Sequence, residues 1–137
     1  LASKPESIFM EATDYSKLVQ NDIRESGGVY ELRTYLANSG KLGLLNERFR
    51  EHTAAIFNRH GIGNVFYWKA FDEPQSKNTL IYLVHHADRK QADANWRAFS
   101  DDPDWKKVLR ESQINGAFLA QPPERIYLRA TDFSSLK

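Results

Sequence analysis

The acid–base chemistry available to this chain is concentrated in a few residues, and His52 is the most prominent of them. It follows Phe49 by three residues and precedes Ile56 by four, so it borders an apolar stripe with helical spacing and is expected to point towards a sheet. A neutral imidazole placed there could act as a general base or bind a ligand. The alternative is a histidine at the edge of the core that hydrogen-bonds to a neighbour. His52 is therefore a candidate catalytic residue.

Glu31 and Arg33 form a second candidate pair. They stand two residues apart in a run rich in β-branched and aromatic residues, so they share one face of a predicted strand. There they form either a structural ion pair or, if partly buried, a pair that orients a polar ligand. In the second case Arg33 would hold an oxyanion, which makes it the other candidate catalytic residue.

The remaining histidines do not predict a metal site. His60 ends the predicted first helix, where an imidazole can cap the last carbonyl groups, and His85 and His86 point to opposite faces of a strand. His52 and His60 are more than two helical turns apart, and the chain has no cysteine. Neither a metal nor a cofactor is expected. Glycine-rich nucleotide motifs and the GxSxG nucleophile motif are also missing.

Aromatic residues are unusually frequent in the predicted strands and the second helix. They could line a cavity for a flat apolar molecule, or they could fill a core and a dimer seam. If a ligand binds, we expect it to contact the aromatic residues together with the two candidate catalytic side chains. The predicted ligand-binding set is Tyr30, Arg33, His52, Trp68, Tyr82 and Trp96.

The elements that must position these residues follow the order β-α-β-β-α-β, which predicts a ferredoxin-like α+β fold. Asn38-Ser39-Gly40 offers a cap for the first helix, and Asp88 caps the second. Asp102-Pro103 ends that helix and begins a third. The predicted strands are 29–36, 64–71, 79–85 and 126–130, and the predicted helices are 41–60, 88–100 and 103–112.

The two central strands carry apolar residues on both faces. On the strand at 79–85, Leu80, Tyr82 and Val84 alternate with Ile81 and Leu83. A sheet with one solvated face would alternate apolar and polar residues instead. Two helices can cover only one face, so we expect a second copy of the domain to cover the other, either as a homodimer or as a tandem neighbour.

The first 18 residues are a diverged copy of residues 119–136, and this favours the tandem arrangement. Ten of the eighteen positions are identical without a gap, at an offset of 118 residues, which is the length of one small domain. We therefore expect residues 1–18 to be the last strand of a preceding homologous domain, 19–28 a linker, and 29–137 a complete domain. The strand at 7–12 should add to a sheet edge of its own subunit or of a dimer mate.

Composition excludes several kinds of partner. The net charge is +1, with 19 basic and 18 acidic residues, so nucleic acid is not an expected partner. No apolar run is long enough for membrane insertion. The compartment is unknown; cytoplasmic is the default, because any targeting segment would precede residue 1.

Five motifs stand out within about residues 28–137: VYELRTY, SGKLGLLNERFREHT, the Tyr67-Trp68 pair, NWRAFSDDPDW and the closing ATDFS. Together they resemble the NIPSNAP family. The resemblance implies a ferredoxin-like fold that pairs into a dimeric α+β barrel, and the family includes tandem-domain members. It does not supply catalytic residues.

Two functions follow as hypotheses. The first is a self-associating assembly or small-ligand-binding module. The alternative is a cofactor-independent monooxygenase or isomerase acting on a small hydrophobic substrate, with His52 as base and Arg33 as the oxyanion holder. A pocket that joins His52 to Arg33 would favour the enzyme, whereas a sheet face packed with aromatic side chains would favour assembly.

Overall fold

Five antiparallel strands form a single sheet in the computed structural model, which describes residues 9–21 and 28–129. The strand order is β1-β3-β4-β2-β5, so the two ends of the chain supply the two edges. This is the ferredoxin-like α+β arrangement predicted above, with one extra edge strand. The strands are β1 (Met10–Ala12), β2 (Val29–Leu36), β3 (Gly63–Ala70), β4 (Thr79–His86) and β5 (Glu124–Arg129).

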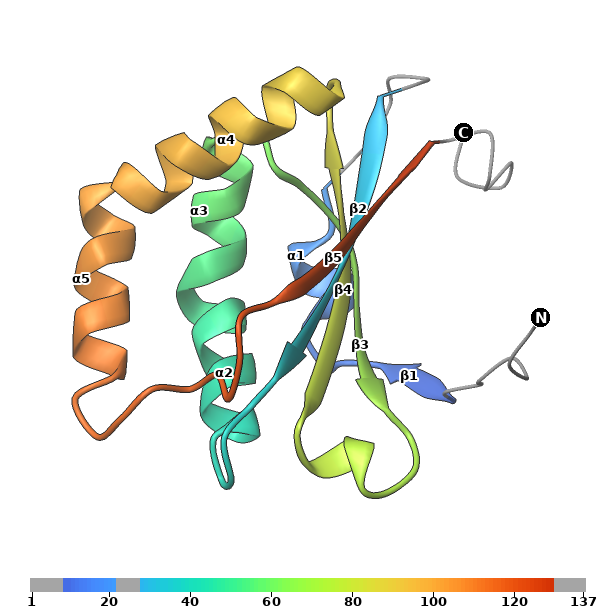
Figure 1. Ribbon diagram of the computed structural model, residues 1–137, viewed down its shortest axis with the longest axis vertical. Coiled ribbons are helices and arrows are strands. Elements are labelled where there is room, and N and C mark those ends of the chain that lie inside the picture. The colour runs from blue at the N-terminus through green and yellow to red at the C-terminus, as the bar shows by residue number, and fades with distance from the viewer. Residues whose placement is uncertain (1–8, 22–27, 130–137) are drawn as a thin grey trace.

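The long helices form one layer on one side of the sheet, as Figure 1 shows. The opposite side of the sheet carries no helix among the described residues (Figure 1), and we call it the open face. The helices are α1 (Ser16–Val19), α2 (Leu42–Arg48), α3 (Ala54–Arg59), α4 (Arg89–Asp101) and α5 (Pro103–Ser112).

The predicted first helix is one continuous rod with an irregular centre. Between α2 and α3 lies a π-helical turn, Phe49–Thr53, in which the Ala54 N–H donates to the Phe49 carbonyl five residues back. The predicted cap at Asn38-Ser39-Gly40 was wrong: Lys41 is the N-cap residue and makes no side-chain capping bond. Gly61 ends the rod with a φ of +78°, a conformation that glycine adopts without steric cost.

The predicted helix cap at Asp88 and the predicted break at Asp102-Pro103 are confirmed. Asp88 accepts a hydrogen bond from the Gln91 N–H at the start of α4. Asp102 separates α4 from α5 and accepts bonds from the N–H groups of Asp104 and Trp105. Pro103 occupies the first turn of α5, where its missing N–H costs nothing.

A β-bulge in β3 changes which of its residues share a face. The pairing of β3 with β4 shifts between Asn64 and Phe66, so neighbouring residues there do not alternate strictly between the two faces of the sheet. Val65 consequently packs with Phe66 and Trp68 on the open face, rather than with Tyr67 beneath the helices.

The N-terminal segment is part of the domain. Within the predicted strand at 7–12, residues 7 and 8 lie outside the described part, and Met10–Ala12 pair with β3, as strand addition to an edge predicts. After β1 the chain forms α1, and Tyr15 is fully buried in the core. That residues 1–18 derive from a preceding domain stays a prediction.

Two separate apolar clusters result, one on each side of the sheet. The larger lies under the helices and includes Leu45, Phe49, Phe57, Tyr82 and Val84. The smaller lies on the open face: it consists of Tyr30, Val65 and Leu83, flanked by Leu32, Phe66, Trp68 and Leu128. The two-sided apolar pattern of the central strands is therefore confirmed, and burial extends along the whole of β4.

Candidate functional site

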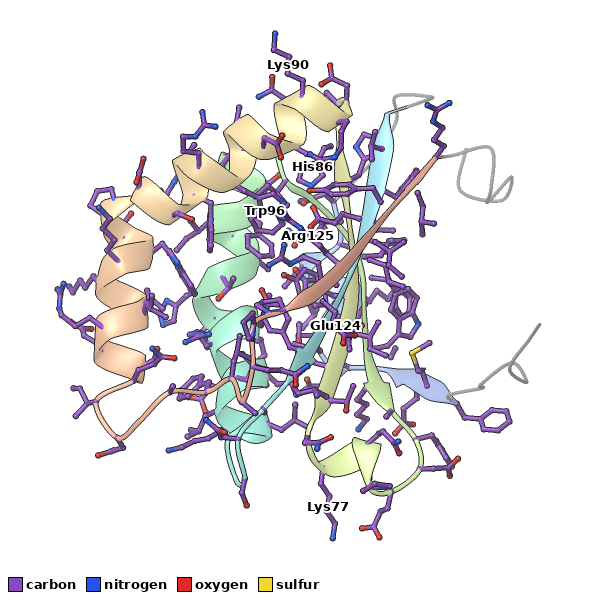
Figure 2. All side chains as sticks on the ribbon, in the orientation of Figure 1. Lys77, His86, Lys90, Trp96, Glu124 and Arg125 are labelled. Carbon is purple, nitrogen blue, oxygen red and sulfur yellow. The ribbon has the colours of Figure 1, made fainter. Side chains whose placement is uncertain are left out.

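Glu31 is the centre of a buried polar cluster between the sheet and α4. Its side chain has no solvent exposure, and its carboxylate accepts three hydrogen bonds. The donors are Arg33 Nη1 at 2.9 Å, His86 Nε2 at 2.9 Å and Trp96 Nε1 at 2.7 Å. His86 and Trp96 point into the space between α4 and the sheet in Figure 2. All of the donors that a buried carboxylate requires are thus supplied from β2, β4 and α4.

This environment holds Glu31 in its charged form. Burial alone would raise the pKa of the carboxyl group, but the hydrogen bonds from His86 and Trp96 and the charge of Arg33 outweigh it. The pKa falls from 4.5 to about 2. A carboxylate this acidic is a poor proton acceptor at neutral pH, so the cluster is suited to holding structure and charge rather than to general base catalysis.

Arg33 is held on several sides. Its guanidinium carbon lies 4.2 Å from the centre of the Trp96 ring, and Nη2 lies 3.5 Å from the Tyr35 hydroxyl. The Tyr35 and Tyr82 hydroxyls are 2.8 Å apart. Arg33, Tyr82 and Trp96, three residues of the predicted ligand-binding set, therefore do lie together beneath the helices.

A cavity of 160 Å³ lies beside this cluster, between the sheet, the first helical rod and α5. The polar residues that line this cavity are Arg48, Tyr35, Thr53 and Gln113. Its apolar lining is Phe49, Phe57, Phe99, Trp105, Leu109, Ala117 and Leu119. Neither Arg33 nor His52 is among the lining residues.

His52 does not point towards the sheet, so that prediction was wrong. It is exposed and lines an outer groove of 580 Å³ between the helical rod and α5, with Lys107, Glu111 and Ser112 among its neighbours. The π-helical turn is the physical reason, because its extra residue rotates His52 outwards while Phe49 and Thr53 remain buried.

The last two members of the predicted set, Tyr30 and Trp68, lie on the open face. Tyr30 is 2% exposed and packs edge-on against His85, with 5.0 Å between ring centres. The Trp68 ring lies 4.6 Å from that of Phe66. The six residues predicted to share one ligand are thus distributed over three places: the buried cluster, the outer groove and the open face.

The NIPSNAP profile matches residues 30–135. This chain belongs to the NIPSNAP family. No protein with curated annotation matches it.

Solved NIPSNAP structures share this fold. A NIPSNAP family protein from Agrobacterium tumefaciens matches with a TM-score of 0.68 at 19% identity, covering 86% of this chain and 98% of that one. A second protein from the same organism, described as having unknown function, has a TM-score of 0.60 at 19% identity, with 74% and 86% covered. An uncharacterized NIPSNAP-like domain protein from Burkholderia xenovorans has a TM-score of 0.62 at 17% identity, with 73% and 82% covered. At these identities the likeness concerns the fold alone.

Two features of this NIPSNAP domain were not predicted from the sequence. No partner was predicted for His86, because Glu31 is 55 residues away in the chain, although the two side chains hydrogen-bond between β4 and β2. Arg48 was not predicted either; it is buried on the side of the helical rod where mainly apolar residues lie. A charged residue three positions from Leu45 and one from Phe49 was the available signal.

Across 9–21 and 28–129, no group of three or more His, Cys, Asp or Glu side chains could hold a metal ion. Within those ranges no helix is both long and apolar enough to cross a bilayer.

Proposed function

We propose that this NIPSNAP domain is an assembly module that pairs, through its open face, with a second copy of the same domain. Each of the five strands contributes apolar side chains to the open face, and this observation carries the proposal. Met10 on β1 and Ile126 on β5 extend the central cluster to both flanks, with 42% and 57% of their surfaces exposed. A contiguous apolar surface on a sheet favours burial against another sheet.

The internal repeat supports a second copy as the partner. A chain that carries a second version of its own last strand is expected to come from an array of such domains. In an array the neighbouring domain is available to cover the open face. In isolation, two chains would cover each other's open faces around a twofold axis.

The contacts of the N-terminal segment support a specific way in which two domains associate. We call the surface that this segment occupies, on the β3 edge and the first helical rod, its seat. The Thr13 N–H donates to the Tyr67 carbonyl at 3.0 Å, and the Tyr67 N–H donates to Ser16 Oγ at 2.8 Å. The Tyr15 hydroxyl donates to Asn46 Oδ1 at 2.7 Å, and its ring is fully buried. The repeat ATDYSKL at 12–18 therefore acts as a docking segment for the β3 edge and the first helical rod.

The second version of this repeat, ATDFSSL at 130–136, retains the threonine, the serine and an aromatic ring at Phe133. These residues lie outside the described part of the chain. In our proposal this sequence can bind the same site on a copy of the domain in which that site is empty, as in an array where each domain docks the tail of the domain before it. Strand addition of this kind supplies main-chain hydrogen bonds, and the buried ring supplies specificity.

The enzymatic alternative finds less support. It required one pocket that joins His52 to Arg33. The outer groove is lined by His52 but not by Arg33, and the 160 Å³ cavity is lined by neither. Arg33 is instead engaged by Glu31 and Trp96.

Sedimentation velocity of the full chain tests the assembly function. We expect a species of twice 15.8 kDa. Ile126→Lys should weaken the dimer at least tenfold, because it places a charge on an exposed part of the open face at little cost to folding. Ile114→Lys is the matched control, since Ile114 is 78% exposed at the end of the helical layer. A wild-type chain that stays monomeric at high micromolar concentration would overturn the proposal.

A peptide experiment tests the docking mode. Tyr15→Gly with Ser16→Gly empties the seat in the full chain, and a peptide of residues 128–137 should then bind and raise the unfolding midpoint. The same peptide with Phe133→Asp should not. If a peptide of residues 10–19 restores the midpoint and that of 128–137 does not, the two repeats are not interchangeable and this mode is wrong.

A further inference from the structure

Arg48 is a buried cation without an acidic partner. Its residue is 6% exposed, and the ion pairs among described residues do not include it. Nη1 donates to Ser112 Oγ at 3.1 Å, while Nε has no hydrogen-bond partner. An unpaired buried charge costs several kcal/mol unless something compensates it. Arg33, which is partly buried, has Glu31 as its acidic partner.

Aromatic rings partly offset this cost without neutralising the charge. The guanidinium carbon of Arg48 lies 4.6 Å from the centre of the Phe118 ring and 5.1 Å from that of Trp105. Burial lowers the pKa of Arg48, and the nearby Tyr35 and Tyr82 hydroxyl groups oppose this only in part. The side chain is thus held in place but left with a free donor.

The Arg48 side chain borders an apolar space of defined size. Arg48 lines the 160 Å³ cavity, whose other walls are mainly aromatic and aliphatic. An apolar cavity of about 150 Å³ is large enough to hold benzene. Arg48 also lines a second, outer groove with Leu44, His52 and Asn115, so it stands at the boundary between the cavity and the surface.

We propose that this cavity binds a small monocarboxylate with a compact apolar or planar body, whose carboxylate group pairs with Arg48. The guanidinium offers the planar fork of donors that a carboxylate matches. One cation compensates one negative charge, which fits a monoanion better than a phosphate dianion. The aromatic walls suit a body no larger than a phenyl ring. This site is independent of the open face, because it lies under the helices.

Benzoate is a suitable probe, with benzamide as its neutral isostere. In the full chain labelled with ¹⁵N, the Arg48 Nε–H resonance should shift on addition of benzoate, because this group has no partner in the unliganded protein. Arg48→Met should weaken benzoate binding at least tenfold, and Arg48→Lys should retain part of it. Arg50→Met is the control, since Arg50 lies on the same rod but is exposed and pairs with Asp14 and Glu51.

The unfolding midpoint gives a second readout. Without benzoate, Arg48→Met should be as stable as the wild type or more stable, because an uncompensated buried charge has been replaced by an apolar side chain of similar length. With benzoate, only chains that keep Arg48 should gain stability.

Three results would overturn the proposal. The first is benzoate binding that Arg48→Met leaves unchanged. The second is equal affinity for benzamide, which would show that charge plays no part. The third is a wild-type chain that binds none of acetate, isobutyrate and benzoate at millimolar concentration.

Discussion

Replacing Glu31 with glutamine removes the charge at the centre of the buried polar cluster with little change in shape. The amide keeps one acceptor oxygen but presents an NH₂ group to donors, so at least one of Arg33, His86 and Trp96 loses its partner. Arg33, whose side chain is 11% exposed, also loses its counter-ion. Removing one member of a buried ion pair usually costs about 3–5 kcal/mol.

The lowered pKa of Glu31 gives an independent value for the stability that its charge contributes. The difference between 4.5 for the ordinary carboxyl group and about 2 in the folded chain corresponds to about 3 kcal/mol of stability at neutral pH. Because the folded pKa is the lower one, this stability is complete above pH 4.5 and is lost as the pH falls through 2. About 1 kcal/mol should remain at pH 3.

Urea unfolding of the wild type and Glu31→Gln at pH 7 and pH 3 measures the stability lost on substitution and how this loss depends on pH. We expect the variant to be less stable by about 3 kcal/mol at pH 7, with the difference falling to roughly 1 kcal/mol at pH 3. Glu51→Gln is the control, because its exposed ion pair with Arg50 contributes less than about 1 kcal/mol. A loss that is the same at both pH values would refute the electrostatic reasoning and point to altered packing instead.

Two further predictions concern the stability of the domain at Tyr15 and at Gly28. Tyr15→Ala should destabilise the domain by about 3–5 kcal/mol in urea unfolding, because the ring is fully buried. Tyr15→Phe should cost only about 1 kcal/mol, because it removes only the hydrogen bond to Asn46. Equal effects of the two substitutions would contradict the assigned packing. Gly28→Ala should lower the thermal midpoint, because the φ of +79° disfavours a side chain and the added Cβ would lie 2.6 Å from the His86 carbonyl oxygen. An unchanged midpoint would show that this turn relaxes freely.

The order of the elements followed from hydrophobic periodicity because the periods are local properties of the chain. The strand at Val29–Leu36 and the helix cap at Asp88 were predicted at their observed positions. Local chemistry also indicated the Asp102-Pro103 break between α4 and α5. Such signals depend on a few adjacent residues and do not require knowledge of what packs against them.

The candidate site was harder to predict because two irregularities rotate side chains. The π-helical turn moves His52 outwards, and the bulge at Asn64 moves Val65 to the open face. A prediction that assumes an ideal period of 3.6 or 2.0 residues cannot detect either irregularity. The pairing of Glu31 with His86 depends on strand register, which a single sequence does not reveal.

The strand at Met10–Ala12 also has a consequence for how far assembly can proceed. An uncovered edge of β3 would be a template on which one chain after another could pair and grow into a fibre. Here the chain covers that edge itself, with Thr13 and Ser16 continuing the bonds to Tyr67. The outer edge of the sheet on this side is then β1, which is only three residues long, and so short an edge strand is a poor template for further pairing. Growth along the hydrogen-bonding direction is therefore disfavoured on this side, and the N-terminal segment favours finite complexes.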